Sequence, residues 1–199
     1  MNLVILIGSI ILWGIVHSWL ASLEAKKLLV RVFGKNRMRV YRLAYNIFAI
    51  LSFAPVLLLV RLIPDQNLYN VPSPWLFLMV AGQGLSALML LVGFLQTDAL
   101  SFIGLRQLVE LDELTGTLVT NGLYRLIRHP LYLFGLLFIW LTPVMTRNLL
   151  IVFISLTVYI FIGAYFEERK LLSVFGQAYA EYKSRTPMMI PSLIFRRNK

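Results

Sequence analysis

The sequence predicts an all-α integral membrane protein. We expect a polytopic bundle of about five transmembrane helices, the last two forming a tight helical hairpin, followed by an interfacial amphipathic helix. Hydrophobic residues make up 59% of the 199-residue chain and charged residues only 14%, and the mean hydropathy is +0.77. Soluble domains are about 45–50% apolar and about a quarter charged. The apolar residues also lie in long uncharged runs, which excludes a soluble globular domain and a disordered basic tail.

Three apolar runs in the first half are expected to span the membrane. Leu3 to Leu23 and Trp75 to Leu95 reach the roughly 20 residues that a spanning helix needs, and Leu43 to Val60 is slightly shorter. A signal peptide begins with a basic region, whereas only Met1 and Asn2 precede the first run. The first run is therefore interpreted as a retained helix.

Two further apolar runs, Leu131 to Met145 and Leu149 to Phe166, are separated only by Thr146, Arg147 and Asn148. So short a connection joins antiparallel neighbours, which predicts the hairpin. The first run would be about 22 Å long as a helix, which is short for a membrane core of about 30 Å. The hairpin is therefore either partly re-entrant or begins before Pro130.

The remaining segments are not expected to cross the membrane. Leu100 to Tyr124 is rich in polar and acidic residues, including Glu110, Asp112 and Glu113, and predicts an irregular connection. Glu167 to Arg185 predicts a single amphipathic helix that lies at the interface or against the bundle. Its apolar stripe consists of Leu171, Val174, Phe175, Ala178 and Tyr182.

The positions of the basic residues predict the orientation. If five helices alternate, 17 of the 19 Lys and Arg residues fall on one face, and the exceptions are Arg61 and Arg147. Basic residues are concentrated in cytoplasmic loops, so the N-terminus is expected outside and the C-terminus in the cytoplasm. The net charge of +10 is thereby explained by topology, and no nucleic-acid partner is needed.

The strongest candidate for a ligand site begins at Arg128-His129-Pro130. Proline favours the first turn of a helix, so Arg128 and His129 are expected at the positive end of the hairpin's first helix, which favours anionic groups. Glu167 and Glu168 lie at the end of the last apolar run, where carboxylates oppose the helix dipole. The hairpin would return these acids to the level of Arg128. A ligand with an ammonium and a carboxylate fits this arrangement, and the alternative is a direct salt bridge without a ligand.

Two stretches resemble the isoprenylcysteine carboxyl methyltransferase family, small membrane enzymes with the phospholipid methyltransferases as more distant relatives. They are GTLVTNGLYRLIRHPLYLFG, Gly116 to Gly135, and FEERKLLSVFGQAYAEYKSRTPMMIP, Phe166 to Pro191. The resemblance implies that S-adenosylmethionine is the cofactor and that residues 96–199 are the cofactor-binding region, packed in one structural unit with N-terminal helices in 1–95. The cofactor-binding residues that it implies are Thr117, Leu118, Val119, Tyr124, His129, Pro130, Leu131, Tyr132 and Glu167.

The chain departs from the isoprenylcysteine enzymes at Gly163, where that family has an Arg four residues before the Glu. The segments Phe102 to Gln107 and Val16 to Ala21 are instead similar to membrane methanethiol S-methyltransferases, which are bacterial. The resemblance therefore implies methyl transfer to a small or lipophilic acceptor, favours a thiol, and places the chain in a prokaryotic cytoplasmic membrane. Carboxyl methylation of isoprenylcysteine-like substrates and N-methylation of phospholipid head groups are the alternatives.

Methylation of a thiol benefits from a cation that favours the thiolate, since the ordinary thiol pKa is near 8.5. Arg128 and Arg106 are the candidate catalytic residues. His17 is an ionisable residue within an apolar run, where a functional role competes with a neutral hydrogen bond between helices. The chain contains no cysteine, which excludes disulfides and thiolate metal sites, and no metal is expected. The competing class is a non-enzymatic membrane scaffold or transporter component.

Overall fold

The computed structural model describes residues 2–109 and 117–190 and divides the chain into two compact units. Unit 1 consists of Met1–Val71, Asp98–Thr115 and Val144–Tyr159. Unit 2 consists of Pro72–Thr97, Gly116–Pro143 and Ile160–Lys199. Each unit is thus assembled from three separate stretches of chain, and the expected boundary between residues 95 and 96 stays a prediction.

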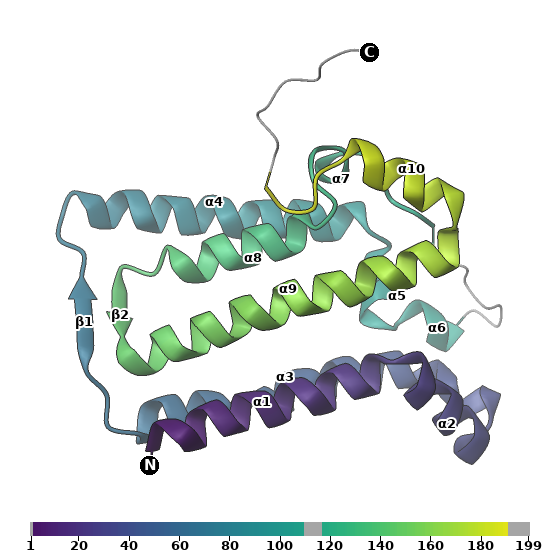
Figure 1. The fold of residues 1–199 in the computed structure, drawn as a ribbon, viewed down its shortest axis with the longest axis horizontal. Helices are drawn as coiled ribbons and strands as arrows, with labels where there is room; N and C mark the ends of the chain where they lie inside the picture. The colour runs from purple at the N-terminus through teal and green to yellow at the C-terminus, as the bar shows by residue number, and fades with distance from the viewer. Residues whose placement is uncertain (1, 110–116, 191–199) are drawn as a thin grey trace. The chain divides into compact units, whose positions relative to one another are not determined.

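Unit 1 is built around two long apolar helices, α1 (Asn2–Ala21) and α3 (Tyr41–Leu62), which lie side by side (Figure 1). The first part of α9 (Arg147–Phe175) packs with them. The buried core of this unit consists of Leu6, Ile10, Val56, Ile63 and Val152. Burial of these aliphatic side chains holds the three helices together.

The basic segment between α1 and α3 is helical rather than a loop. Helix α2 (Leu23–Phe33) begins at Ser22, whose side-chain oxygen accepts a hydrogen bond from the Ala25 N–H at 3.1 Å. It ends at Gly34, which has a φ of +79° that favours glycine. A 3-10 helix, η1 (Lys35–Val40), then leads into α3.

Two short strands connect the C-terminal end of α3 with the N-terminal end of α9. Strand β1 (Asn67–Asn70) pairs antiparallel with β2 (Val144–Thr146), which immediately precedes α9. The fully buried Asn148 donates from its side-chain Nδ2 to the carbonyl oxygens of Val60 at 3.3 Å and Ile63 at 3.0 Å. These are carbonyls at the C-terminal end of α3, which lack partners within the helix. The Asn148 amide is thus a cap for α3 supplied by α9.

Replacing Asn148 with Ala is expected to lower the free energy of unfolding by about 2–3 kcal/mol, because two carbonyls at a buried helix end lose their donor. Thermal unfolding of the detergent-solubilised protein measures this loss. Asn46→Ala is the matched control, because the Asn46 amide also donates to two carbonyls, those of Phe102 and Ile103, at a more exposed position. Equal, small losses in the two variants would contradict the capping role.

Unit 2 pairs a long apolar helix, α4 (Trp75–Gln96), with a short one, α8 (Pro130–Trp140) (Figure 1). Glycines of α4 allow the close approach: a Cβ at Gly93 would lie 3.1 Å from the Leu131 side chain. Gln83 of α4 donates from Nε2 to the Phe138 carbonyl oxygen at 3.0 Å, in the last turn of α8. The second half of α9 adds Ala164 to a buried cluster with Leu136 and Met189.

Three expectations about helix boundaries are corrected. Helix α8 ends at Trp140 rather than Met145, and the chain then becomes extended as β2. Helix α9 continues through Glu167 to Phe175, so the expected single helix from Glu167 to Arg185 is wrong. Gly176, with a φ of +54°, separates α9 from α10 (Gln177–Arg185).

In its described parts, the connection expected to be irregular contains three short helices. These are α5 (Ala99–Ile103), α6 (Arg106–Val109) and α7 (Leu123–Leu126). Several residues used in the sequence analysis lie outside the described ranges, so their expected places stay predictions. They are Met1, Glu110, Asp112, Glu113, Gly116, Pro191, Arg196, Arg197 and Lys199.

Within residues 2–109 and 117–190, four helices are long and apolar enough to cross a membrane. They are Asn2–Ala21, Met38–Leu62, Trp75–Gln96 and Arg147–Phe175, and α8 is a shorter apolar helix of 11 residues. The prediction of a helical integral membrane protein is confirmed at this level. The structure adds the β1–β2 pair, which no pattern in the sequence indicated.

Candidate functional site

The candidate site of unit 2 begins where the chain enters α8. His129 precedes the helix with φ −124° and ψ 64°, and Pro130 occupies its first turn, as the sequence predicted. The backbone N–H groups of Arg128 and His129 donate to the carbonyl oxygens of Pro187 at 2.9 Å and Met188 at 3.0 Å. The positive end of the α8 dipole is thereby fixed against the segment that follows α10.

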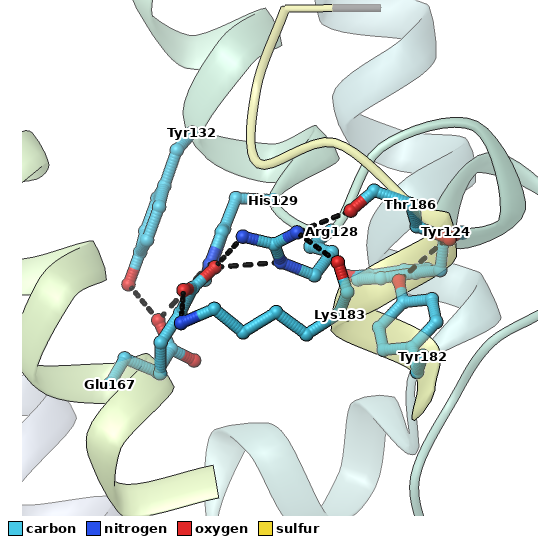
Figure 2. A network of polar contacts seen from close by, with 9 residues as sticks. Tyr124, Arg128, His129, Tyr132, Glu167, Tyr182, Lys183 and Thr186 are labelled. Carbon is cyan, nitrogen blue, oxygen red and sulfur yellow. Dashed lines mark hydrogen bonds and ion pairs between the residues drawn. The ribbon is translucent and has the colours of Figure 1, made fainter. Parts of the chain in front are cut away.

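The Arg128 guanidinium forms a buried ion pair with Glu168 (Figure 2). Its Nη2 and Nε lie 2.5 Å and 2.7 Å from Glu168 Oε1, and both side chains are only 8% exposed. Its Nη1 donates to the carbonyl oxygens of Lys183, at 3.1 Å, and Thr186. Lys183 also places its ammonium 2.8 Å from Glu168 Oε2. Arg128 therefore joins the start of α8, the end of α9 and the end of α10.

Glu167 points to a different environment from its neighbour. Its side chain is 42% exposed, and its Oε2 accepts a hydrogen bond from the Tyr132 hydroxyl at 2.7 Å (Figure 2). The Tyr132 ring stacks on the His129 ring, with centroids 5.2 Å apart and an interplanar angle of 6°. The two adjacent carboxylates therefore lie in different environments. Glu168 is buried and paired with cationic side chains, whereas Glu167 is partly exposed at the surface of the site.

His129 lies between the two carboxylates. Its Nδ1 is 3.7 Å from Glu167 Oε2 and its Nε2 is 3.4 Å from Glu168 Oε1. Burial lowers the pKa of His129, and the attraction of Glu167 and Glu168 for the charged form opposes this effect without outweighing it. At neutral pH the imidazole is therefore uncharged. Its ring face stacks on Tyr132, and its two nitrogens lie near the two carboxylates.

The lowered pKa of His129 predicts a pH-dependent stability. In the unfolded chain the imidazole binds a proton at its ordinary pKa of about 6.5, whereas the folded protein resists this protonation. The free energy of unfolding is therefore highest above this ordinary pKa, and it declines as the pH falls toward the lower pKa of His129 in the folded protein. Unfolding midpoints in detergent between pH 7.5 and pH 5 are expected to decline less steeply in His129→Gln than in the unmodified protein. Parallel pH profiles would contradict this role.

The outer part of the site is formed by tyrosines. The Tyr182 hydroxyl of α10 donates to the Tyr124 carbonyl oxygen at 2.6 Å, and burial raises the pKa of Tyr182 to about 12, so the hydroxyl keeps its proton. This bond fixes α10 against α7. Just before it, Gly122 has a φ of +55° and packs directly on the Gln96 side chain, where a Cβ would clash. Gln96 Oε1 accepts the Leu123 N–H at 2.8 Å.

The structure brings four of the predicted site residues together, namely Arg128, His129, Tyr132 and Glu167, with Pro130 and Leu131 beside them in the first turn of α8. Tyr124 contributes its backbone carbonyl to the adjoining contact with Tyr182. The segment Thr117 to Val119 has irregular backbone, with Thr117 exposed and the other two residues half-buried. Within residues 2–109 and 117–190, this segment forms no hydrogen bond to Glu167 or Glu168.

Arg106 belongs to unit 1. Its Nη1 lies 2.6 Å from Asp98 Oδ2, and both side chains are more than one-third exposed. The Asp98 carboxylate also accepts the Ser101 N–H, and the hydrogen bonds from Ser101 and the nearby Arg106 lower the pKa of Asp98. The catalytic roles expected for Arg106 and Arg128 stay predictions.

Sequence reasoning missed three contributors, Lys183, Tyr182 and Thr186. Their contact with Arg128 and Tyr124 depends on the turn at Gly176, which directs α10 back toward α7 and α8. The glycine was the available signal for this turn. Of the two acids expected at the level of Arg128, the structure pairs Arg128 with Glu168.

Comparisons with known proteins agree with the motifs. The chain is 40% identical over 114 residues to methanethiol S-methyltransferase 2 of Bradyrhizobium diazoefficiens, covering 54% of this chain and 44% of that protein. It is 41% identical over 83 residues to methanethiol S-methyltransferase of Pseudomonas deceptionensis, covering 42% of this chain and 31% of that one. It is 33% identical over 135 residues to methanethiol S-methyltransferase of Pseudomonas sp. (strain GM41(2012)), covering 62% of this chain and 49% of that protein.

Each of these matches is partial. The chain spans about half the length, or less, of the curated relatives it matches. No solved structure matches the chain. The sequence model of the family described as phospholipid methyltransferase matches residues 77–178, which is half of the chain and includes most of α4, all of α8 and the Glu167–Glu168 pair. The expected relationship is confirmed, and the chain belongs to the phospholipid methyltransferase family.

Proposed function

We propose that the chain is a membrane methyltransferase that uses S-adenosylmethionine to methylate a small thiol. The observation that carries this proposal is the difference in environment between the two adjacent carboxylates. Glu168 is paired with Arg128 and Lys183, whereas the Glu167 side chain is 42% exposed beside the first turn of α8. A partly exposed carboxylate next to a helix N-terminus suits a ligand that carries an ammonium and a carboxylate on one carbon.

The residues present fit the methionine end of this cofactor. The Glu167 carboxylate would accept the ammonium, and Tyr132 would hold Glu167 in position through its 2.7 Å hydrogen bond. The first turn of α8 would face the ligand carboxylate. When bound, the cofactor supplies a methyl group already activated on a sulfonium. From the motif, we assign the remaining contacts to Thr117, Leu118, Val119, Tyr124, His129, Pro130 and Leu131.

A thiol acceptor is favoured by the relatives and by Gly163. The relatives compared above are named methanethiol S-methyltransferases. Gly163 lies one helical turn before Glu167, and a Cβ added there would meet no atom within 4 Å, so the position offers space and no charge. The thiol must lose its proton to solvent, and Arg106 and Arg128 are the proposed cations that would favour the thiolate electrostatically. The contacts of Arg128 support a positioning role, because its guanidinium is engaged by Glu168 and by two backbone carbonyls.

The finer topology is also a proposal: five crossings of a prokaryotic cytoplasmic membrane, N-terminus outside, with residues 96–199 as the cofactor-binding region. The β1–β2 pair supports it. Strand β1 follows α3 and β2 precedes α9, so both connections lie at one level. A crossing between Pro130 and Thr146 would return the chain to that level after α4, which supports the proposed count of five. Eleven helical residues cover roughly 16 Å and the extended remainder about as much again, which together match a core of about 30 Å.

The deciding experiment combines binding with methyl transfer. S-Adenosylhomocysteine is expected to bind the detergent-solubilised protein, and His129→Ala and Glu167→Ala are expected to weaken this binding. Labelled methyl transfer is then measured with small alkyl thiols, a prenylcysteine and phosphatidylethanolamine, and the thiols are expected to be methylated.

The outcomes separate two levels of the proposal. Absence of binding, or binding unchanged in the two variants, would overturn the methyltransferase function. Methylation of phosphatidylethanolamine or prenylcysteine in place of thiols would overturn only the choice of acceptor.

Gly163→Arg tests the assignment of the acceptor side. The new guanidinium is expected to reduce thiol methylation at least tenfold, since it occupies the open space, and to permit carboxyl methylation of a prenylcysteine. Product analysis by mass spectrometry distinguishes the two reactions. Gly163→Met is the control, because it adds similar bulk without a charge and is expected to lower thiol methylation without the new activity. Prenylcysteine methylation by the unmodified protein would contradict the assignment.

A further inference from the structure

Helix α5, which lies shortly before Arg106, packs against α3 within unit 1. The side chain of Asn46, on α3, donates from Nδ2 to the carbonyl oxygens of Phe102 at 3.0 Å and Ile103 at 2.7 Å. Both carbonyls lie at the C-terminal end of α5, where the last carbonyls of a helix lack partners within it. The Asn46 amide therefore caps α5 from a neighbouring helix.

Gly104 ends α5 in direct contact with the backbone of α3. Its φ is +100°, in the left-handed region that favours glycine. A Cβ at this position would lie 2.5 Å from the Leu43 backbone nitrogen and 2.9 Å from the Arg42 carbonyl carbon, so a side chain does not fit. Asn46 and Gly104 thus fix the end of α5 against α3, two residues before Arg106.

Asp98 connects the start of this segment with its end. Its Oδ1 accepts the Ser101 N–H at 3.2 Å, which caps α5, and its Oδ2 lies 2.6 Å from Arg106 Nη1. The hydrogen bonds from Ser101, followed by the charges of Arg106 and Arg42, lower the pKa of Asp98, so its carboxylate is ionised at neutral pH. Two guanidinium groups near one carboxylate leave these three side chains with a net positive charge.

A fixed position matters for a cation that favours a thiolate. An opposite charge shifts a pKa strongly only from within about 4–6 Å. An arginine on a free segment would have to be ordered each time an acceptor binds. In unit 1 the contacts with α3 set the backbone before Arg106, and Asp98 orients its guanidinium, so this ordering precedes binding.

We propose that Asn46 and Asp98 are positioning residues for Arg106, whose guanidinium they hold where it favours the thiolate of the acceptor. Asn46 acts through the backbone of α5, and Asp98 acts on the guanidinium directly. The inference rests on the proposed methylation of a thiol and on the cationic role proposed there for Arg106.

Two thiols of similar size and different acidity test the proposal. The value of kcat/KM is measured at pH 7 with ethanethiol and with 2,2,2-trifluoroethanethiol, which is more acidic and needs less stabilisation of its thiolate. Asn46→Ala and Asp98→Ala are each expected to lower the value for ethanethiol about tenfold, the effect of one pKa unit on the thiolate fraction. For the acidic thiol we expect a loss of at most about threefold, because much of it is ionised without help. A merely structural role would lower both values alike.

Two further variants separate geometry from general stability. Asp98→Asn keeps an oxygen that can cap α5 and accept a hydrogen bond from Arg106, so it is expected to retain most of the ethanethiol activity. Asp65→Ala is the matched control in unit 1. The Asp65 carboxylate also accepts backbone N–H groups, those of Gln66 at 2.8 Å and Asn148 at 3.0 Å. Its loss is expected to affect the two thiols alike.

Arg106→Gln shows whether both residues act through the arginine. It is expected to reproduce the loss that is selective for ethanethiol, and adding Asn46→Ala or Asp98→Ala is expected to cause no further selective loss. Unchanged activity in Arg106→Gln, equal losses for the two thiols in the alanine variants, or a further selective loss in the double variants would each overturn the inference.

Failure of the proposed function would look different. The unmodified protein would then not methylate ethanethiol at all, and this inference would fall with the function. Asp98→Ala alone is decisive if Asn46→Ala fails to fold.

Discussion

Glu167→Gln is expected to lower the affinity for S-adenosylhomocysteine about 30-fold or more while leaving the unfolding midpoint nearly unchanged. The affinity falls because an amide no longer pairs with the ligand ammonium, and loss of one partner of such a charge pair costs about 2–5 kcal/mol. The stability is kept because Glu167 is 42% exposed and Tyr132 can donate to an amide oxygen as it does to the carboxylate. Isothermal titration calorimetry and thermal unfolding measure the two quantities.

Two variants serve as controls for Glu167. Tyr132→Phe removes the hydroxyl that orients the carboxylate, and we expect an intermediate loss of affinity of about tenfold. Glu168→Gln is the matched neighbour, and we expect it to change stability far more than affinity. If the two glutamates lost affinity equally, the separation of their roles would be wrong.

The second large effect is expected at the buried pair. Arg128→Met alone should lower the free energy of unfolding by about 3–5 kcal/mol, because Glu168 keeps its charge inside the protein with the half-exposed Lys183 as its remaining cationic partner. Glu168→Met should be costly for the same reason, with Arg128 left unpaired. The double variant should recover much of the loss, since two apolar side chains of similar length need no charge compensation.

Denaturant titrations of the four proteins provide the measurement as a double-mutant cycle. Lys183→Met is the control, since its side chain is 48% exposed and the surrounding solvent screens its contact with Glu168. We expect a loss below about 1 kcal/mol there. Additive losses in the double variant would show that Arg128 and Glu168 do not act as a pair.

The sequence predicted those elements whose conformation is determined by the residues within the element itself. A long uncharged run has one stable form in a membrane, so α1, α3 and α4 follow almost directly from composition. Pro130 likewise marked the start of α8, because proline cannot continue a helix on its N-terminal side. In these cases the residue type by itself restricts the backbone.

The elements that were missed depend on partners distant in sequence. Strand β2 exists because β1 pairs with it, and nothing within Val144 to Thr146 distinguishes it from the preceding apolar run. Helix α9 continues past Glu167 because Arg128 neutralises the next residue, Glu168, so the charges that suggested a boundary do not end the helix. Which of two adjacent acids faces the interior is decided by the arginine's position in the fold.

The early end of α8 has a consequence for how the protein is inserted. A helix of 11 residues exposes its last carbonyls well before the far side of a hydrocarbon core, and lipid offers them no donor. Gln83 supplies one from α4, at the Phe138 carbonyl. In the five-crossing topology that we propose, the short helix would gain this donor only once α4 lies beside it. α4 precedes α8 in the order of synthesis, so we expect the first half of the family domain to enter the membrane before the second half packs against it.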